Sequence, residues 1–180
     1  AAHLDRPDRM IFDLDPPVGE VPAARRAART VRAVLEDLGL PAAVMTTGSK
    51  GYHVVVPLRP EADRGRVAEA AEAIARLTAA RHPTRLTTEF RIAKRQGRVF
   101  LDWLRNRYAQ STVAPWSLRP RAGAPVAMPI AWEELGRAAP DRWKLPDVER
   151  RLEEGDPWAG LEDRAVPVQG ALSALEEAQA

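Results

Sequence analysis

The order of the predicted elements, which is strand, helix, strand, strand, helix, strand, indicates an α+β fold. Three observations lead to this order: short apolar runs that alternate with a period of two, two amphipathic stretches with helical spacing, and turn residues between them. We expect a small antiparallel or mixed sheet with helices packed on it, as in RRM-like and ferredoxin-like folds. The chain of 180 residues is expected to form one domain over residues 1–180, in which residues 164–180 are a terminal helix or a tail.

The first predicted strand is the apolar run from Met10 to Leu14, which acidic residues interrupt. A period of two places Asp13 and Asp15 on one face of this strand, and Pro16 ends it. A helix over about 22–38 follows, because apolar residues recur there at helical spacing while arginines occupy the opposite side. Two carboxylates are therefore expected to project together from a strand end.

The next predicted unit is a hairpin followed by a second helix. Two β-rich runs, 43–47 and 52–58, are separated by the turn Gly48-Ser49-Lys50-Gly51. Asp63 then has the position of an N-cap for the second helix. The last predicted strand, 98–104, carries Asp102 among apolar residues, and we expect this carboxylate to share a face with the side chains of Phe100 and Leu104.

The remaining chain gives weaker signals. Residues 114–129 are rich in Pro and small residues, which predicts an extended loop with one short strand near Val126. Short helices are predicted at 132–135 and 148–152.

Composition excludes several classes of protein. The chain has no Cys and only three His, so a bound metal is expected to have oxygen ligands. No apolar run approaches the roughly 18 residues that span a bilayer, and the N-terminus has no export signal, so we expect a cytoplasmic protein without a membrane partner. Basic residues number 27 and acidic residues 25, but the stretch from Arg85 to Arg121 holds nine basic and two acidic residues. This stretch predicts either a cationic face for phosphates or a solvated surface.

Three strand-borne acids carry the strongest chemical signal. An unpaired carboxylate in a strand as apolar as that of Asp102 costs several kcal/mol unless a cation compensates it. Asp13, Asp15 and Asp102 can converge at one edge of a small sheet, whereas the alternative for the first two is an exposed acidic turn. Oxygen ligands favour Mg²⁺ or Mn²⁺, and a pair of such ions is the usual device for phosphoryl transfer.

A second signal is the turn with its following residues, Gly48 to His53. It offers backbone N–H groups, the Ser49 hydroxyl, the Lys50 ammonium and the His53 imidazole, which together suit a phosphate. The alternatives are an ordinary hairpin turn and a core histidine with a satisfied hydrogen bond. Four arginines in the basic stretch are candidates for binding a triphosphate or a nucleic-acid backbone through paired hydrogen bonds, namely Arg95, Arg105, Arg119 and Arg121. The alternative is that they only make the surface soluble.

Taken together and in order, these motifs resemble the polymerase domain of bacterial DNA ligase D, a member of the archaeo-eukaryotic primase superfamily. The resemblance rests on residues 10–16, 47–58, 94–102 and 113–126. It implies metal-dependent, template-directed nucleotidyl transfer, in which a primase-polymerase fills gaps at double-strand breaks during non-homologous end joining. It also implies two Mn²⁺ or Mg²⁺ ions as cofactors and association with the nucleoid when the protein is on DNA. The implied partners are DNA with ends or gaps, NTP or dNTP, a separate or fused DNA ligase, and an end-binding protein.

The resemblance assigns a role to each candidate residue. It gives the metal carboxylates, which are also the catalytic residues, as Asp13, Asp15 and Asp102. It gives the nucleotide-binding residues as Ser49, Lys50, His53, Arg95 and Arg105, and the nucleic-acid-binding residues as Arg119 and Arg121.

The family domain carries a further lobe upstream of the first acidic motif, and the chain starts at Ala1, just before that motif. We therefore expect the catalytic portion without that lobe, and no Lys-x-Asp-Gly ligase motif is present. Two other functions stay open, namely a non-catalytic module that binds nucleotide or nucleic acid, and a metal-dependent nuclease.

Overall fold

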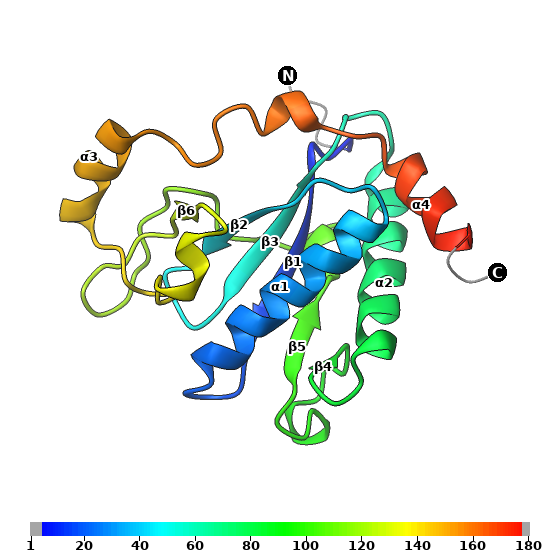
Figure 1. Cartoon of the computed structure of the whole chain (residues 1–180), viewed down its shortest axis with the longest axis horizontal. Coiled ribbons are helices and arrows are strands. Elements are labelled where there is room, and N and C mark those ends of the chain that lie inside the picture. Colours follow the sequence, from blue (N-terminus) through cyan, green and yellow to red (C-terminus); the bar gives the residue numbers. More distant parts are fainter. Residues whose placement is uncertain (1–4, 178–180) are drawn as a thin grey trace.

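The structure is a computed structural model that describes residues 5–177 (Figure 1). Within this part of the chain, six strands form one sheet in the order β4-β5-β1-β3-β2-β6. The strands are β1 (Arg9–Asp15), β2 (Ala43–Thr46), β3 (Tyr52–Pro57), β4 (Leu86–Thr87), β5 (Val99–Asp102) and β6 (Pro129–Ile130). The α-helices are α1 (Val21–Asp37), α2 (Arg64–Arg81), α3 (Leu145–Glu154) and α4 (Val168–Glu177).

The centre of the sheet confirms the predicted α+β class. Strand β1 pairs antiparallel with β3 on one side and with β5 on the other, and β3 pairs antiparallel with β2. The four strands of the predicted strand-helix pattern therefore lie in the order fourth, first, third, second, which is the ferredoxin-like arrangement. The short strand β4 adds a parallel partner to β5, and β6 adds an antiparallel partner to β2.

One face of the sheet is covered by helices and the other is not. Helices α1 and α2 lie across the covered face (Figure 1), where Met10, Phe12 and Leu14 of β1 are completely buried. The alternation of β1 turns Asp13 and Asp15 to the opposite face. Loop segments cover much of this opposite surface, where Ile11 and Val55 are buried and Thr112 lies against His53. Because α1 and α2 do not cover it, we call it the open face.

Local sequence explains the hairpin and the start of α2. Gly48 has a φ of +63°, which suits glycine, and a Cβ at Gly51 would collide with the carbonyl oxygen of Leu14. The turn therefore needs glycine at both positions. The side chain of Asp63 accepts a hydrogen bond of 2.9 Å from the backbone N–H of Arg66, as expected of an N-cap.

Several predicted boundaries were wrong. Strand β5 ends at Asp102, and Leu104 lies in a 3₁₀ turn, so it does not extend the strand face of Asp102. Val126 forms only an isolated bridge with Leu118, and the strand of this region is β6, a few residues later.

The three helical segments predicted in the last third of the chain compare with the structure as follows. The helix expected at 132–135 is a 3₁₀ turn at Glu134–Gly136, and the helix expected at 148–152 is the longer α3. The proposed C-terminal helix forms as α4 beside α2, while residues 178–180 lie outside the described residues (Figure 1). Among residues 5–177, no helix has the length and apolar character to cross a membrane.

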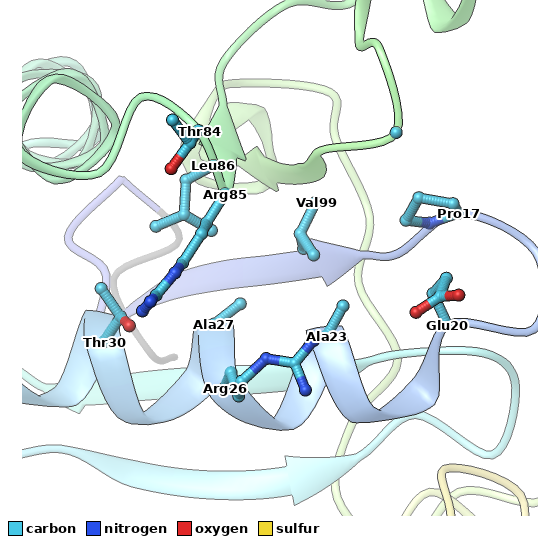
Figure 2. Close-up of a pocket in the computed structure, with 11 residues that line it drawn as sticks. Pro17, Glu20, Ala23, Arg26, Ala27, Thr30, Thr84, Arg85, Leu86 and Val99 are labelled. Atoms are coloured by element: carbon cyan, nitrogen blue, oxygen red, sulfur yellow. The ribbon is translucent and has the colours of Figure 1, made fainter.

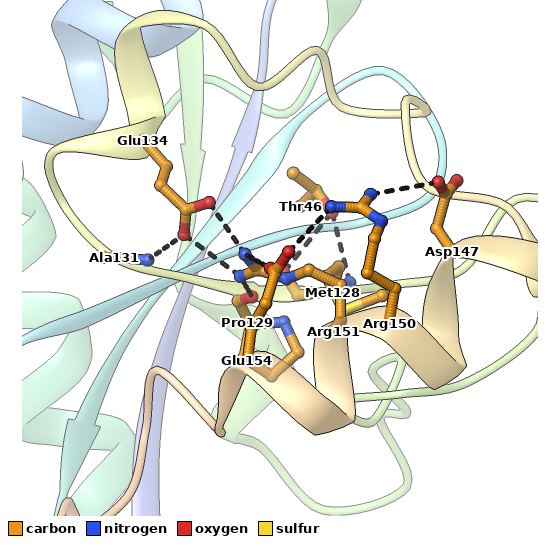
Figure 3. Close-up of polar contacts among 9 residues, drawn as sticks. All are labelled: Thr46, Met128, Pro129, Ala131, Glu134, Asp147, Arg150, Arg151 and Glu154. Atoms are coloured by element: carbon orange, nitrogen blue, oxygen red, sulfur yellow. Dashed lines mark hydrogen bonds and ion pairs between the residues drawn. The ribbon is translucent and has the colours of Figure 1, made fainter.

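A buried arginine fixes α3 to the far edge of the sheet (Figure 3). The guanidinium of Arg151 donates to both carboxylate oxygens of Glu134, at 2.9 and 3.1 Å, and to the carbonyl oxygen of Pro129 at 3.3 Å. It also lies 4.7 Å from the ring centre of Trp143. Removing one partner of such a buried pair typically costs about 3 to 5 kcal/mol, so this contact holds the region that follows the basic stretch in place.

Candidate active site on the open face

Asp13 and Asp102 face each other across the central strands. They are direct register partners in the antiparallel pair β1 and β5, and Asp15 pairs with Phe100 one step further along. Both strands turn these residues to the open face. The structure thus brings together acids that are up to 89 residues apart in the chain, and it buries Asp102, which is 5% exposed.

The cation that compensates these carboxylates is Arg105. Its Nε lies 3.2 Å from an oxygen of Asp13 and 3.3 Å from an oxygen of Asp102. Arg105 was predicted to contact the nucleotide or template, and here it pairs directly with two of the predicted metal ligands. The requirement for a cation near Asp102 is thus met by a side chain of the same protein.

Asn106 holds the turn that carries Arg105. Its amide nitrogen donates to the carbonyl oxygens of Ile11, at 2.8 Å, and Trp103, at 2.7 Å, and its amide oxygen accepts from the N–H of Ile11 at 2.8 Å. The residue is buried. Sequence reasoning missed this role, because an asparagine between two arginines carries no pattern that separates it from a surface residue.

His53 lies on the other side of Asp13. It is the register partner of Asp13 in the β1 and β3 pair, and its Nε2 lies 3.5 Å from a carboxylate oxygen of Asp13. Its Nδ1 lies 3.4 Å from the hydroxyl of Thr112, a residue that no sequence pattern selects. His53 is 3% exposed, so it is buried as a core histidine would be, but its ring is directed to the acidic site.

The environment shifts the pKa values of the two facing acids in opposite directions. Burial raises the pKa of Asp13, but hydrogen bonding and charge from His53 and Arg105 outweigh burial and leave the pKa below its ordinary value. Burial also dominates at Asp102 and leaves its pKa raised, although the N–H of Leu104 donates to it and Arg105 is close. The neighbouring carboxylates Asp13 and Asp15 add to this rise. A further cation would therefore stabilise the charged form of Asp102.

The predicted phosphate turn lies beside the acids. The ammonium of Lys50 lies 3.2 Å from a carboxylate oxygen of Asp15. The side chain of Arg119 packs against Gly48, where a Cβ would come within 2.6 Å of its Cγ. The Nε of Arg119 is buried and has no hydrogen-bond partner within residues 5–177, and Ser49 is partly exposed. A donor without a partner next to this turn suits an anionic ligand.

The other two arginines are placed differently. The guanidinium of Arg95 donates to the carbonyl oxygens of Glu89 and Phe90, both at 3.0 Å, and lies 3.9 Å from the ring centre of Phe100. Because Phe100 pairs with Asp15, Arg95 stands at the margin of the open face. Arg121 is exposed, and no side-chain contact links it to the acids in the described part of the chain.

The donor set suits a divalent metal, although the acids are held by cations of the protein. Carboxylate oxygens are the ligands that Mg²⁺ and Mn²⁺ prefer. As they stand, the described residues contain no group of three or more His, Asp or Glu side chains close enough to hold an ion. Arg105 and Lys50 instead neutralise Asp13, Asp15 and Asp102. Binding of an ion would therefore require these cations to move away.

The fold and the site together define a ferredoxin-like domain with a carboxylate centre on its open face, bordered by a glycine turn and arginines. The family model described as "LigD, primase-polymerase domain" matches residues 1–158. The chain belongs to this family, and its membership implies a requirement for a divalent metal.

The sequence is also similar to those of curated LigD proteins. The chain is 38% identical over 163 residues to the multifunctional non-homologous end joining protein LigD of Pseudomonas aeruginosa, covering 88% of this chain and 19% of that protein. It is also 38% identical over 168 residues to the LigD DNA repair protein of Mycobacterium tuberculosis, covering 92% of this chain and 22% of that protein. The chain thus spans about a fifth of the length of these curated relatives.

A solved structure supports the fold assignment. The polymerase domain of Mycobacterium tuberculosis ligase D, determined in complex with DNA, superimposes with a TM-score of 0.77 at 34% sequence identity. The match covers 89% of this chain and 56% of that chain.

Proposed function

We propose that this chain catalyses template-directed nucleotidyl transfer, as the primase-polymerase that fills gaps at broken DNA ends during non-homologous end joining. The observation that carries the proposal is the pair Asp13 and Asp102, which face each other on an open sheet face beside the Gly48 to Gly51 turn. Membership of the LigD primase-polymerase family supports the same reaction.

We assign the ion ligands to Asp13, Asp15 and Asp102, with two Mn²⁺ or Mg²⁺ ions as the proposed complement. When bound, such ions supply positive charge to the attacking and departing oxygens of a phosphoryl transfer. His53 lies 3.5 Å from Asp13 and keeps that carboxylate charged and oriented. The low pKa of Asp13 makes it an ion ligand over the whole physiological range.

The triphosphate of the incoming nucleotide is assigned to the turn. Ser49 supplies a hydroxyl, Lys50 an ammonium, and Arg119 the buried Nε that has no partner within residues 5–177. Lys50 lies against Asp15, so the triphosphate would be held next to the proposed ions. Arg105 would exchange its carboxylates for a phosphate oxygen when nucleotide and ions enter, because guanidinium binds both groups by similar geometry.

The nucleic-acid strand is assigned to the basic stretch. Arg95 stands at the margin of the open face and Arg121 on an exposed turn, where each can meet a backbone phosphate. The proposed partners are gapped or broken DNA, NTP or dNTP, a fused or separate ligase and an end-binding protein. This work would take place in the bacterial cytoplasm, on the nucleoid.

Primer extension tests the proposal. The protein is incubated with Mn²⁺, a labelled gapped duplex and NTP or dNTP, and Asp13→Asn is compared with the matched control Asp163→Asn on the exposed surface. We expect extension by the wild type and the control and none by Asp13→Asn. Extension that persists in Asp13→Asn would overturn the proposal.

The same assay separates the two other functions. A primer that is shortened in a metal-dependent way would identify a nuclease. DNA binding without extension or shortening would identify a non-catalytic module.

A further inference from the structure

A cavity lies on the side of the sheet away from the acids (Figure 2). It has a volume of about 330 Å³ and is bounded by one side of α1 and by the sheet edge at β4 and β5. This volume is at the lower end of the range for ligand pockets, about 300 to 1,000 Å³. The polar and turn residues that line it are Glu20, Arg26, Thr30, Thr84, Arg85 and Gly97.

Two arginines at this cavity have no partner in the protein. Neither the Arg26 nor the Arg85 side chain makes a hydrogen bond, ion pair or ring contact within residues 5–177. In Figure 2, Arg85 extends from the sheet edge toward Thr30 on α1, and Arg26 runs along the helix toward Ala23. Glu20 is the one acid among the described lining residues, and it forms no ion pair with either arginine.

Three other arginines near this cavity have partners in the protein. Arg25 of α1 donates to the hydroxyl of Tyr52 at 3.2 Å, and Arg32 of α1 donates to Glu36 at 2.7 Å. Arg81, at the end of α2, lies 3.5 Å from Asp37. The exposed Arg29 of α1 also has no such partner within residues 5–177, so Arg26 and Arg85 are distinguished by lining the same cavity and not by the lack of partners alone.

The cavity offers the donors that a phosphate group requires. Two guanidinium groups can each form paired hydrogen bonds to phosphate oxygens, and the hydroxyls of Thr30 and Thr84 are further donors. The backbone under Arg85 is fixed, because its carbonyl oxygen accepts a 2.9 Å hydrogen bond from the N–H of Val99. One donor group therefore projects from a rigid sheet edge and the other from a long helix.

A basic segment connects this cavity to the acids. Arg95 stands at the margin of the open face, against Phe100, while Gly97, two residues later, lines the cavity. Arg91 and Lys94, which precede Arg95 in the chain, are exposed. Cations therefore lie on both faces of the sheet near the β4 and β5 edge, with Arg95 at the open face and Arg85 at the cavity. A nucleic-acid strand that passes around this edge can contact both.

We propose that the cavity of Arg26 and Arg85 binds a phosphate group, and that the phosphate belongs to the DNA strand that passes from the carboxylate centre around the β4 and β5 edge. The proposal rests on the proposed function only in taking DNA as the ligand. A free phosphate or pyrophosphate has the same chemistry, but it would leave the basic segment between the two sites without a role.

Binding measurements test the proposal without reference to catalysis. The double variant Arg26→Gln with Arg85→Gln is compared with Arg32→Gln with Arg81→Gln, which removes the same charge from the same region. Fluorescence anisotropy follows a duplex with a long single-stranded overhang and a duplex with a short one, over a range of salt, in the absence of nucleotide. Thermal unfolding confirms that both variants are folded.

We expect the cavity variant to bind the duplex with the long overhang about tenfold more weakly than the wild type does, because the variant loses charge-assisted hydrogen bonds. The slope of log affinity against log salt should fall by about 0.7, since each neutralised phosphate on a single strand contributes about 0.7. The control and the short overhang should show little change. Equal effects of the two double variants on both substrates would overturn the proposal, because they would indicate general charge alone.

A second titration separates the source of the phosphate. Inorganic phosphate and pyrophosphate are titrated calorimetrically into the wild type and the cavity variant. Loss of pyrophosphate binding with unchanged DNA binding would overturn the assignment to a DNA strand. The anisotropy and calorimetric measurements involve no turnover, so failure of this inference is distinguishable from failure of the polymerase assignment, which primer extension by Asp13→Asn tests.

Discussion

Asp13 and Asp102 are cross-strand neighbours, and each places a carboxylate oxygen within 3.3 Å of the same nitrogen of Arg105. The protein therefore carries its own counter-ion at the position where a divalent ion is proposed. A divalent ion and the guanidinium of Arg105 therefore compete for the same two carboxylates.

Arg105→Gln should raise the affinity for Mn²⁺ in the absence of nucleotide. In the variant, the ion no longer competes with a cation that lies against Asp13 and Asp102. If displacing that cation costs about 1 kcal/mol in the wild type, its absence raises the Mn²⁺ affinity about fivefold. Calorimetric titration with Mn²⁺ measures the change. The control is Arg107→Gln, two residues away, whose side chain lies over Trp103 and contacts Glu72. Equal Mn²⁺ affinity in the wild type and Arg105→Gln would contradict the competition.

His53→Ala should weaken nucleotide binding in the presence of Mn²⁺ by about tenfold or more. Asp13, a proposed ion ligand, loses its contact with His53, and a charge-assisted hydrogen bond contributes about 1.5 to 3 kcal/mol. Binding is measured per folded molecule, with His82→Ala at the end of α2 as the control. If His53→Ala unfolds the protein while the folded fraction binds nucleotide normally, His53 is a core residue only.

Gly48→Ala should affect both folding and nucleotide binding. The φ of +63° strains any other residue, at about 1 to 3 kcal/mol, and the new methyl group would displace Arg119. Gly39→Ala is a matched control, because its φ of +69° carries the same strain while its Cβ would meet open space. Both variants should lower the melting temperature, and only Gly48→Ala should also weaken nucleotide binding. Equal nucleotide affinity in the two variants would argue against a role for Arg119.

The pairing of Glu134 with Arg151 should make stability depend on acid pH. Burial raises the pKa of Glu134, but the N–H of Ala131 and Arg151 outweigh burial and leave the pKa below its ordinary value. The carboxylate therefore stabilises the fold fully above the unfolded-state pKa, about 4.3, and this contribution is lost as the pH falls through the folded-state pKa.

Urea unfolding of the wild type and Glu134→Gln between pH 7 and pH 3 measures this dependence. The wild type should be the more stable at pH 7, and the difference should narrow below about pH 4.3. Glu153→Gln, an exposed acid on α3, serves as the control and should show no such dependence. A difference that stays constant with pH would show that the ion pair does not stabilise the fold.

The sequence predicted those features that are encoded by neighbouring residues. The period of two in β1 placed Asp13 and Asp15 on one face, and the glycines predicted the turn between β2 and β3. Strands β4 and β6 have two residues each, which is too short to show a period, so they were missed or misplaced. Their positions depend on pairing with strands that are distant in the chain.

The candidate site was predictable in its members but not in its contacts. The acids and the basic residues near them could be selected by type and context. That Arg105 lies between Asp13 and Asp102 depends on the register of β1 against β5, which no local pattern encodes. The buried Nε of Arg119 beside Gly48 joins residues 71 positions apart. The ligand roles of these residues stay predictions.

Asn106 makes the position of Arg105 depend on β1 itself. Strand β5 ends at Asp102, and the amide group of Asn106 takes over as the hydrogen-bonding partner of both backbone groups of Ile11. Strand β1, which carries Asp13, and the turn that carries Arg105 are thereby joined at Ile11, two residues from Asp13. Insertions between Asp102 and Asn106 would therefore separate the opposite charges of the site. The distance between opposite charges in this site is thus set by a peptide-like side chain.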